Sequence, residues 1–286
     1  MYKCFKISGE SFDLTMLSQE ENFVKNCKMY GEKLKEEIAY SFDKILEKAL
    51  DANGVISGEY FIDTWFSTEK YDVFLSYSHD DQEIALLLAG FLRHQFGLKV
   101  FIDELFWGSA DKLLQSLDER YCKKAYKKYD YKKRNFTTTH VHAMLSTAIA
   151  KTIDNSEIII FLNTEKSTYK LKDEICKERT LSPWIYEEIF FTSVIKTKEW
   201  YEHREEYAVK ESFYLKESMS ISYVLPDEHL IPLRYEDICA WKDQWKKEKQ
   251  KENGIYKNYF SKEKGMIRHP LNVLYNLKRE INNNRE

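Results

Sequence analysis

The sequence predicts a parallel α/β fold in which helices cover both faces of one sheet. Two observations predict it. Between residues 71 and 103, an apolar strand, an amphipathic helix and a second strand follow one another, which makes a βαβ unit with parallel strands. At residues 157–163, Glu-Ile-Ile-Ile-Phe-Leu-Asn contains a continuous apolar run, and such runs are typical of strands covered on both faces.

The βαβ unit has clear boundaries. Its first strand is predicted at residues 71–78, where Val-Phe-Leu lies between polar residues. A helix is predicted from about residue 80 to residue 95, because its apolar residues recur at helical spacing, and Gly97 ends it. The second strand is predicted at residues 98–103.

Residues 104–146 are expected to be an insertion after the second strand. Residues 104–108, Glu-Leu-Phe-Trp-Gly, are expected to form a loop, and residues 110–117 a helix. A further helix is predicted at residues 143–153, directly before the apolar strand at 157–163.

A basic tract, Arg120 to Arg134, lies within this insertion and has tyrosines between its lysines. Lysines with interleaved aromatic rings are also found in proteins that bind single-stranded nucleic acid. However, Cys122, Tyr126 and Tyr129 follow at i, i+4 and i+7, which favours a helical packing stripe with lysines on its solvated face. The tract is therefore expected to be a solvated surface, and nucleic acid is not expected as a partner.

The two ends of the chain are expected to be helical extensions. Residues 32–50 have an amphipathic pattern that stops at Asp51-Ala52-Asn53-Gly54, and residues 60–66 fit neither element clearly. Near the other end, residues 182–195 begin with Ser-Pro and predict a helix, residues 221–225 and 230–233 are candidate closing strands, and residues 271–281 are a final helix.

Composition excludes several classes of protein. The chain has 286 residues, 43% of them hydrophobic, and a net charge of only −3, so it is not disordered. Its five cysteines are odd in number and dispersed, which predicts reduced thiols and no zinc site. No apolar stretch approaches the ~20 residues of a membrane span, and no secretory signal is recognisable, so a cytoplasmic protein is expected. His140 and His142 are expected on one face of an extended segment, and no metal site is predicted.

The carboxyl ends of the strands are where an open parallel sheet binds ligands. The segments that follow the strands contain neither G-x-G-x-x-G nor a P-loop, which disfavours an ordinary Rossmann dehydrogenase or P-loop NTPase. Trp184 and Glu188 are four residues apart on one predicted helix and therefore share a face. A ring beside a carboxylate suits a ligand with a flat base and a ribose, whereas Glu187 is expected to face solvent.

Three segments together resemble a TIR (Toll/interleukin-1 receptor) domain. They are Tyr-Asp-Val-Phe-Leu-Ser-Tyr-Ser at 71–78, Val-Phe-Ile-Asp at 100–103 and Ser-Pro-Trp-Ile-Tyr-Glu-Glu-Ile at 182–189, which contains the S-x-W-x-x-x-E signature. Their order agrees with the family apart from the insertion. The resemblance covers roughly residues 70–240 and implies a flavodoxin-like parallel sheet. It leaves residues 1–69 as an N-terminal helical extension and 241–286 as a C-terminal helical tail.

The resemblance implies cleavage of NAD⁺, because many bacterial TIR domains are NAD⁺ glycohydrolases or cyclases, and their catalytic glutamate falls on Glu188. One carboxylate suffices, since nicotinamide leaves NAD⁺ as a neutral amine and needs no general acid. The carboxylate would stabilise the oxocarbenium-like ribose through its hydroxyls. NAD⁺ is then the substrate, with no separate cofactor. The other residues that the resemblance assigns to the pocket or the loop beside it are Tyr77, Ser78, His79, Asp103, Trp107 and Trp184.

The function expected from the sequence is therefore NAD⁺ nucleosidase or ADP-ribosyl cyclase activity, releasing nicotinamide with ADP-ribose or a cyclic isomer. A bacterial anti-phage signalling role, self-association through TIR surfaces and a downstream effector that senses the product would accompany it. Two alternatives stay open: a non-catalytic TIR adaptor that acts by self-association, and an N-ribosyl hydrolase or transferase for another nucleotide.

Overall fold

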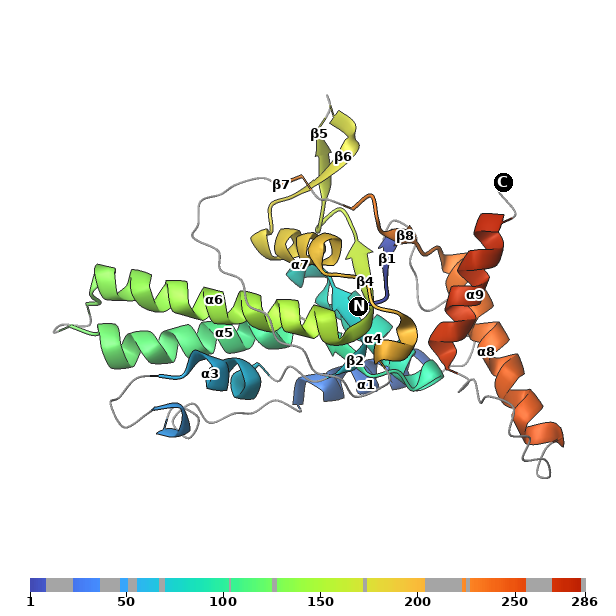
Figure 1. Ribbon diagram of the computed structural model, residues 1–286, viewed down its shortest axis with the longest axis horizontal. Coiled ribbons are helices and arrows are strands. Elements are labelled where there is room, and N and C mark those ends of the chain that lie inside the picture. The colour runs from blue at the N-terminus through green and yellow to red at the C-terminus, as the bar shows by residue number, and fades with distance from the viewer. Residues whose placement is uncertain are drawn as a thin grey trace.

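The computed structural model describes residues 1–8, 23–36, 47–50, 56–66, 70–102, 104–124, 128–171, 174–203, 223–224, 227–255 and 269–283. Its centre is a five-stranded parallel sheet with the strand order β3-β2-β4-β1-β8 (Figure 1). The strands are β1 (Lys3–Ser8), β2 (Tyr71–Ser76), β3 (Val100–Ile102), β4 (Ser156–Asn163) and β8 (Ile231–Pro232).

Strand β4 is the centre of this sheet, and all eight of its residues are buried. It pairs with β2 on one side, with Val73 opposite Ile158, and with β1 on the other, with Phe5 opposite Ile160. The continuous apolar run predicted a strand covered on both faces, and that prediction is confirmed.

Four helices cover the first face of the sheet: α1 (Phe23–Glu36), α4 (Gln82–Phe96), α8 (Tyr235–Ile255) and α9 (Pro270–Asn283). Alternate strand residues such as Leu75, Ile160 and Ile7 point to this side and join one apolar core with these helices. Gly97 ends α4 in the left-handed conformation at φ 71°, as predicted.

The second face is covered by α3 (Gly58–Trp65), α5 (Glu104–Leu117), α6 (Tyr131–Asn155) and α7 (Pro183–Val194). Phe74, Phe101 and Phe161 point to this side, because successive strand residues face opposite ways. The result is a three-layer α/β/α arrangement with one apolar core on each side of the sheet.

A small antiparallel sheet lies beyond the carboxyl ends of the main strands (Figure 1). It contains β5 (Tyr169–Leu171), β6 (Glu174–Thr180) and β7 (Tyr223–Val224). The prediction that residues 221–225 close the main sheet is therefore wrong, because β7 pairs with β6. Short polar runs at 169–180 gave no periodic signal for a second sheet.

The segment before residue 70 differs from the expected helical extension, because it supplies β1 to the main sheet between β4 and β8. In the predicted helix at 32–50, residues 37–46 lie outside the described residues, as does its expected end at 51–54. The unassigned run at 60–66 lies largely in α3, which Ser57 caps by accepting a hydrogen bond from the Tyr60 N–H.

The insertion is a long helical hairpin, and three expectations about it are wrong. Helix α5 begins at residue 104, so the expected loop at 104–108 is helical. The basic tract is not one helix: a π-helical turn at Asp118–Cys122 and an antiparallel bridge from Lys123 to Tyr129 reverse the chain before α6. Helix α6 starts at Tyr131, so His140 and His142 lie on a helix rather than on an extended segment.

The described cysteine side chains are free thiols, as the dispersed spacing predicts. Burial raises the pKa of Cys4 to about 12 and that of Cys27 to about 11, so both thiols stay protonated at neutral pH. Within the described part of the chain, no helix is both long and apolar enough to cross a membrane.

Helices α1 and α4 approach each other through glycines, and this contact yields a test of the fold. A methyl group on Gly90 would lie 1.7 Å from the Cys27 carbonyl oxygen. Because the neighbour is backbone and cannot turn away, we expect Gly90→Ala to lower the free energy of unfolding by at least about 2 kcal/mol, measured by urea denaturation.

The matched control is Gly58→Ala at the start of α3, where an added methyl group meets nothing within 4 Å. We expect its stability to stay within about 0.5 kcal/mol of the parent protein. Equal stabilities of the two variants would contradict the close approach of α1 and α4.

Candidate functional site

Glu188 lies on α7, at the carboxyl end of the main sheet. Ser182 caps this helix by accepting a hydrogen bond from the Ile185 N–H, and Pro183 occupies its first turn, as the sequence predicts. The Glu188 side chain is 0% exposed, and the Ser76 hydroxyl donates a hydrogen bond of 2.6 Å to its Oε2 atom. Ser76 is the last residue of β2, so the segments 71–78 and 182–189 meet at this contact.

The Ser76–Glu188 contact lies at the ends of two strands after which the chain turns to opposite faces of the sheet. Strands β2 and β4 are neighbours, but β2 leads into α4 on the first face and β4 leads towards α7 on the second. Such a divergence at the carboxyl ends of parallel strands is the usual ligand position in open α/β sheets. Glu188 therefore lies beside the position at which open α/β sheets usually bind ligands.

Trp184 lies one turn before Glu188 and is half-buried against the second core. The ring of His142 meets it edge-on, with centroids 5.2 Å apart and an angle of 66°. His142 comes from α6, and the expectation of an extended segment at this position gave no reason to place it beside Trp184. The helical spacing of Val141, Leu145 and Ile149, all buried, is the signal that could have revealed it.

Glu187 does not face solvent, contrary to expectation. It is half-buried against α6, and the Ser146 hydroxyl donates a hydrogen bond to its Oε1 atom. Burial raises the pKa of Glu187, and the Ser146 hydrogen bond opposes that rise. Helix α6 packs against α7, so the two adjacent glutamates have different neighbours. Glu188 contacts the sheet, and Glu187 contacts α6.

The other residues that the resemblance assigns to the site lie in different surroundings. Tyr77 is buried in the first core, on the opposite face of the sheet from α7. Ser78 is half-buried, and His79 is exposed in the short 3-10 turn His79–Asp81. Asp103 lies outside the described residues, and of Trp107 only the position in α5 is described.

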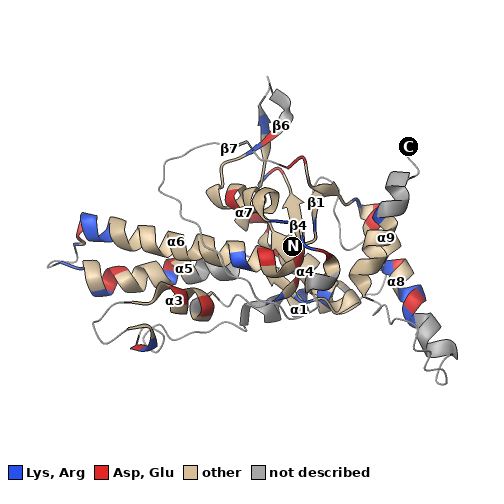
Figure 2. Ribbon diagram, in the orientation of Figure 1, with Lys and Arg blue, Asp and Glu red and all other residues tan. Residues whose placement is uncertain are grey.

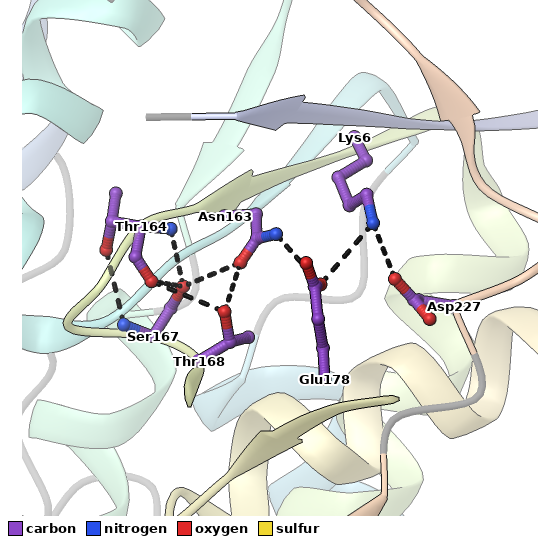
Figure 3. Close-up of polar contacts among 7 residues, drawn as sticks. All are labelled: Lys6, Asn163, Thr164, Ser167, Thr168, Glu178 and Asp227. Atoms are coloured by element: carbon purple, nitrogen blue, oxygen red, sulfur yellow. Dashed lines mark hydrogen bonds and ion pairs between the residues drawn. The ribbon is translucent and has the colours of Figure 1, made fainter. Parts of the chain in front are cut away.

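A polar network, which the sequence analysis did not anticipate, joins β1 and β4 to the small sheet (Figure 3). The Asn163 side chain donates a hydrogen bond of 2.9 Å to Glu178 Oε2, and Lys6 Nζ lies 3.4 Å from the same oxygen and 2.6 Å from Asp227 Oδ2. Burial disfavours the charged form of Lys6, but the hydrogen bond and charge of Asp227, together with Glu178, outweigh it and raise its pKa. Lys6 therefore stays charged and holds the small sheet to the main one.

The loop after β4 closes over the same edge. The Thr164 N–H donates a hydrogen bond to the Ser167 hydroxyl, and the Ser167 N–H donates one to the Thr164 hydroxyl (Figure 3). The Thr164 hydroxyl also donates a hydrogen bond to the buried Asp81. Lys166 forms an ion pair of 3.3 Å with Asp81. These contacts connect the β2 and β4 loops directly. Beside this edge, a cavity of ≈ 400 Å³ lies at the ends of β1 and β8, with Lys6, Ser8 and Arg234 among its lining residues.

At the opposite, amino end of the sheet, Asp72, Glu157 and His269 bring potential ligand atoms within 4.8 Å of one another. The Leu271 N–H donates to His269 Nδ1 at 3.3 Å, which leaves the ring proton on Nε2, 3.6 Å from Asp72 Oδ1. The group is therefore an imidazole–carboxylate contact, and with the Tyr275 hydroxyl on Glu157 it attaches α9 to the sheet.

Fold and site together define a three-layer α/β protein with a buried carboxylate at the carboxyl end of its parallel sheet. No protein-family model, no curated protein and no solved structure matches the chain.

The Ser76–Glu188 hydrogen bond yields a stability prediction. We expect Ser76→Ala to lower the free energy of unfolding by about 1–3 kcal/mol, because a fully buried carboxylate loses a donor. The control is Ser193→Ala, since Ser193 is exposed and donates only to the Phe190 carbonyl oxygen of its own helix. If urea denaturation gave the same small change for both, the hydrogen bond would contribute nothing to stability.

The half-buried Glu187 yields a pH prediction. Its pKa is raised in the folded protein, so ionisation of Glu187 weakens folding at pH values above its ordinary carboxyl value of 4.5. Glu187→Gln removes this charge. We expect it to raise stability relative to the parent protein at about pH 7.5, and to make little difference at about pH 4, where the carboxyl is protonated in both states. A benefit that disappeared on raising the pH would contradict the assignment.

Proposed function

We propose that the protein cleaves the nicotinamide–ribose bond of NAD⁺, with Glu188 as the essential carboxylate. The single observation that carries the proposal is the position of Glu188 against Ser76, the end residue of β2, at the ligand edge of a parallel sheet. Two segments that resemble separate parts of a TIR domain therefore converge on one carboxylate.

The proposed chemistry needs only that one group. As the bond to nicotinamide lengthens, positive charge develops on the ribose, and a carboxylate held near its hydroxyls lowers the energy of that charge. The buried surroundings of Glu188 would strengthen the effect, because the local dielectric constant is low. Water as the acceptor gives ADP-ribose, whereas an atom of the same molecule gives a cyclic isomer.

Access to the site is part of the proposal. Glu188 is fully covered, so NAD⁺ reaches it only if the segments over the carboxyl edge move. The described contacts that attach the loop after β4 and the small sheet there include two polar ones, namely Thr164 with Asp81 and Lys6 with Glu178. Polar contacts of this kind can exchange with water, and self-association or a trigger would favour the open arrangement.

The same burial favours a second candidate, a non-catalytic TIR-like scaffold. In that case Glu188 would be a structural carboxylate that binds Ser76 and holds α7 against β2. Its replacement would then alter stability but no enzymatic activity. The two candidates are separated by one pair of variants.

We expect the purified protein to release nicotinamide from NAD⁺ and Glu188→Gln to lower the rate at least 100-fold, because the uncharged amide cannot balance the positive ribose. Nicotinamide and the linear or cyclic product are measured by chromatography with mass detection. The assay is run at high protein concentration and with a molecular crowder, since assembly is part of the proposal.

The matched control is Glu187→Gln, which removes the same charge from the adjacent residue on α7. It should keep at least about a third of the parent activity, since Glu187 contacts α6 and not the sheet edge. Undiminished turnover by Glu188→Gln would overturn the catalytic role. Release of a base from another nucleotide, but not from NAD⁺, would support an N-ribosyl hydrolase of different substrate.

A further inference from the structure

The free end of the α5–α6 hairpin, far from Glu188, carries exposed aromatic rings. The exposed fraction is 77% for Tyr131, 67% for Phe136, 40% for Tyr121 and 39% for Tyr129. Figure 1 shows the two helices side by side and directed away from the sheet. Soluble proteins rarely expose several aromatic rings at one place, and such a patch usually marks an interaction site.

Positive charge gathers at the same end, as Figure 2 shows. The described residues from 119 to 136 include seven Lys or Arg and two Asp or Glu, in a chain whose net charge is −3. Two of the cations are paired, Lys124 with Asp130 and Arg134 with Asp118. Four others are exposed and form no ion pair within the described part of the chain: Lys123, Lys128, Lys132 and Lys133.

The expectation that this tract is only a solvated helix face depended on a helical spacing that the structure does not have. The chain turns back at Lys123 and Tyr129, so their side chains lie on a reversal and not on one packed stripe. On α6, Lys132, Phe136 and His140 follow at four-residue spacing and are all exposed. One cation and two rings therefore lie in a row along one face.

The described residues on either side of the reversal are held by polar contacts around the buried Asp118, so this part of the hairpin is organised before any partner binds. Asp118 is 4% exposed; it accepts a hydrogen bond of 2.5 Å from the Thr137 hydroxyl and one of 2.8 Å from Arg134. The Asp130 N–H donates to the Cys122 carbonyl oxygen at 2.8 Å. A surface that is ordered in advance loses less entropy on binding.

We propose that this surface, named the hairpin tip and made of Tyr121, Lys123, Lys128, Tyr129, Tyr131, Lys132, Lys133 and Phe136, binds a single-stranded polynucleotide. Lysines neutralise the phosphates, and the rings stack on unpaired bases. A duplex would use the lysines but not the rings, because its bases are already stacked. An anionic membrane fits less well, since no continuous apolar helix face lies beside the lysines among the described residues of the hairpin.

The test uses the full chain and fluorescently labelled oligomers of about 20 nucleotides, which exceed the usual sites of ~4–16. Oligo(dT), oligo(rU) and a duplex of equal length are titrated in fluorescence anisotropy between about 50 and 200 mM salt. We expect single strands to bind at least tenfold more tightly than the duplex. A difference between dT and rU identifies which nucleic acid is the partner, and binding of either supports the proposal.

Three variants locate the binding. Tyr131→Ala with Phe136→Ala should weaken single-strand binding at least about tenfold, since each stacked base contributes ~1–3 kcal/mol and tenfold is 1.4 kcal/mol. Lys132→Gln with Lys133→Gln should lower the slope of log Kd against log salt by about 1.4, or ~0.7 for each lost phosphate contact. Lys246→Gln with Lys247→Gln, on the exposed side of α8, is the matched control and should bind like the parent protein.

Four outcomes would overturn the proposal. The first three are no binding of single strands at low salt, equal binding of the duplex, and tip variants that bind single strands like the α8 control. The fourth is that the tip variants lose binding to phosphatidylcholine–phosphatidylserine vesicles as much as they lose binding to single strands. The altered side chains are exposed, so circular dichroism should show intact folding in every variant. The binding assay does not depend on nicotinamide release, so its failure and that of NAD⁺ cleavage are independent.

Discussion

Strand β4 is the constraint on which the rest of this structure depends. Its eight residues are all buried, with Ile158, Ile160 and Leu162 on one face and Ile159 and Phe161 on the other. A strand of this composition needs an apolar cover on both sides and a paired strand along each edge. Helices from both ends of the chain provide the cover, and the pairing draws in β1 from the first eight residues. The segments outside the TIR-like region are therefore parts of the same core.

Buried carboxylates are the second organising feature, and three of the described ones show a nearby donor beside each. Ser76 binds Glu188, Tyr275 binds Glu157, and Thr137 binds Asp118. Burying a carboxylate is costly unless hydrogen bonds replace its water, so these donors decide where acidic groups can lie inside the fold. The three sites lie in different parts of the fold. One is at the carboxyl edge of the sheet, one is where α9 attaches, and one is at the reversal of the helical hairpin.

The α5–α6 hairpin links the two proposals without joining their sites. Near the sheet, His142 and Ser146 of α6 contact Trp184 and Glu187 of α7, next to the proposed catalytic residue. At its far end, the same helix carries four residues of the hairpin tip, Tyr131, Lys132, Lys133 and Phe136. A single helix therefore extends from one region to the other, and the hairpin is the physical connection between them.

The sequence by itself determined the local elements. The periodicity of residues 82–96, the left-handed cap at Gly97 and the Ser-Pro start of α7 depend on neighbours in the chain, and a single sequence contains that information. The sequence also placed Trp184 and Glu188 one turn apart on one helix, because that spacing is local. Only the tertiary structure decided where β1 pairs, that Glu187 packs on α6 and that Tyr77 faces away from Glu188. These outcomes depend on contacts between residues far apart in the chain, and neither spacing nor periodicity encodes which distant surface will cover a side chain.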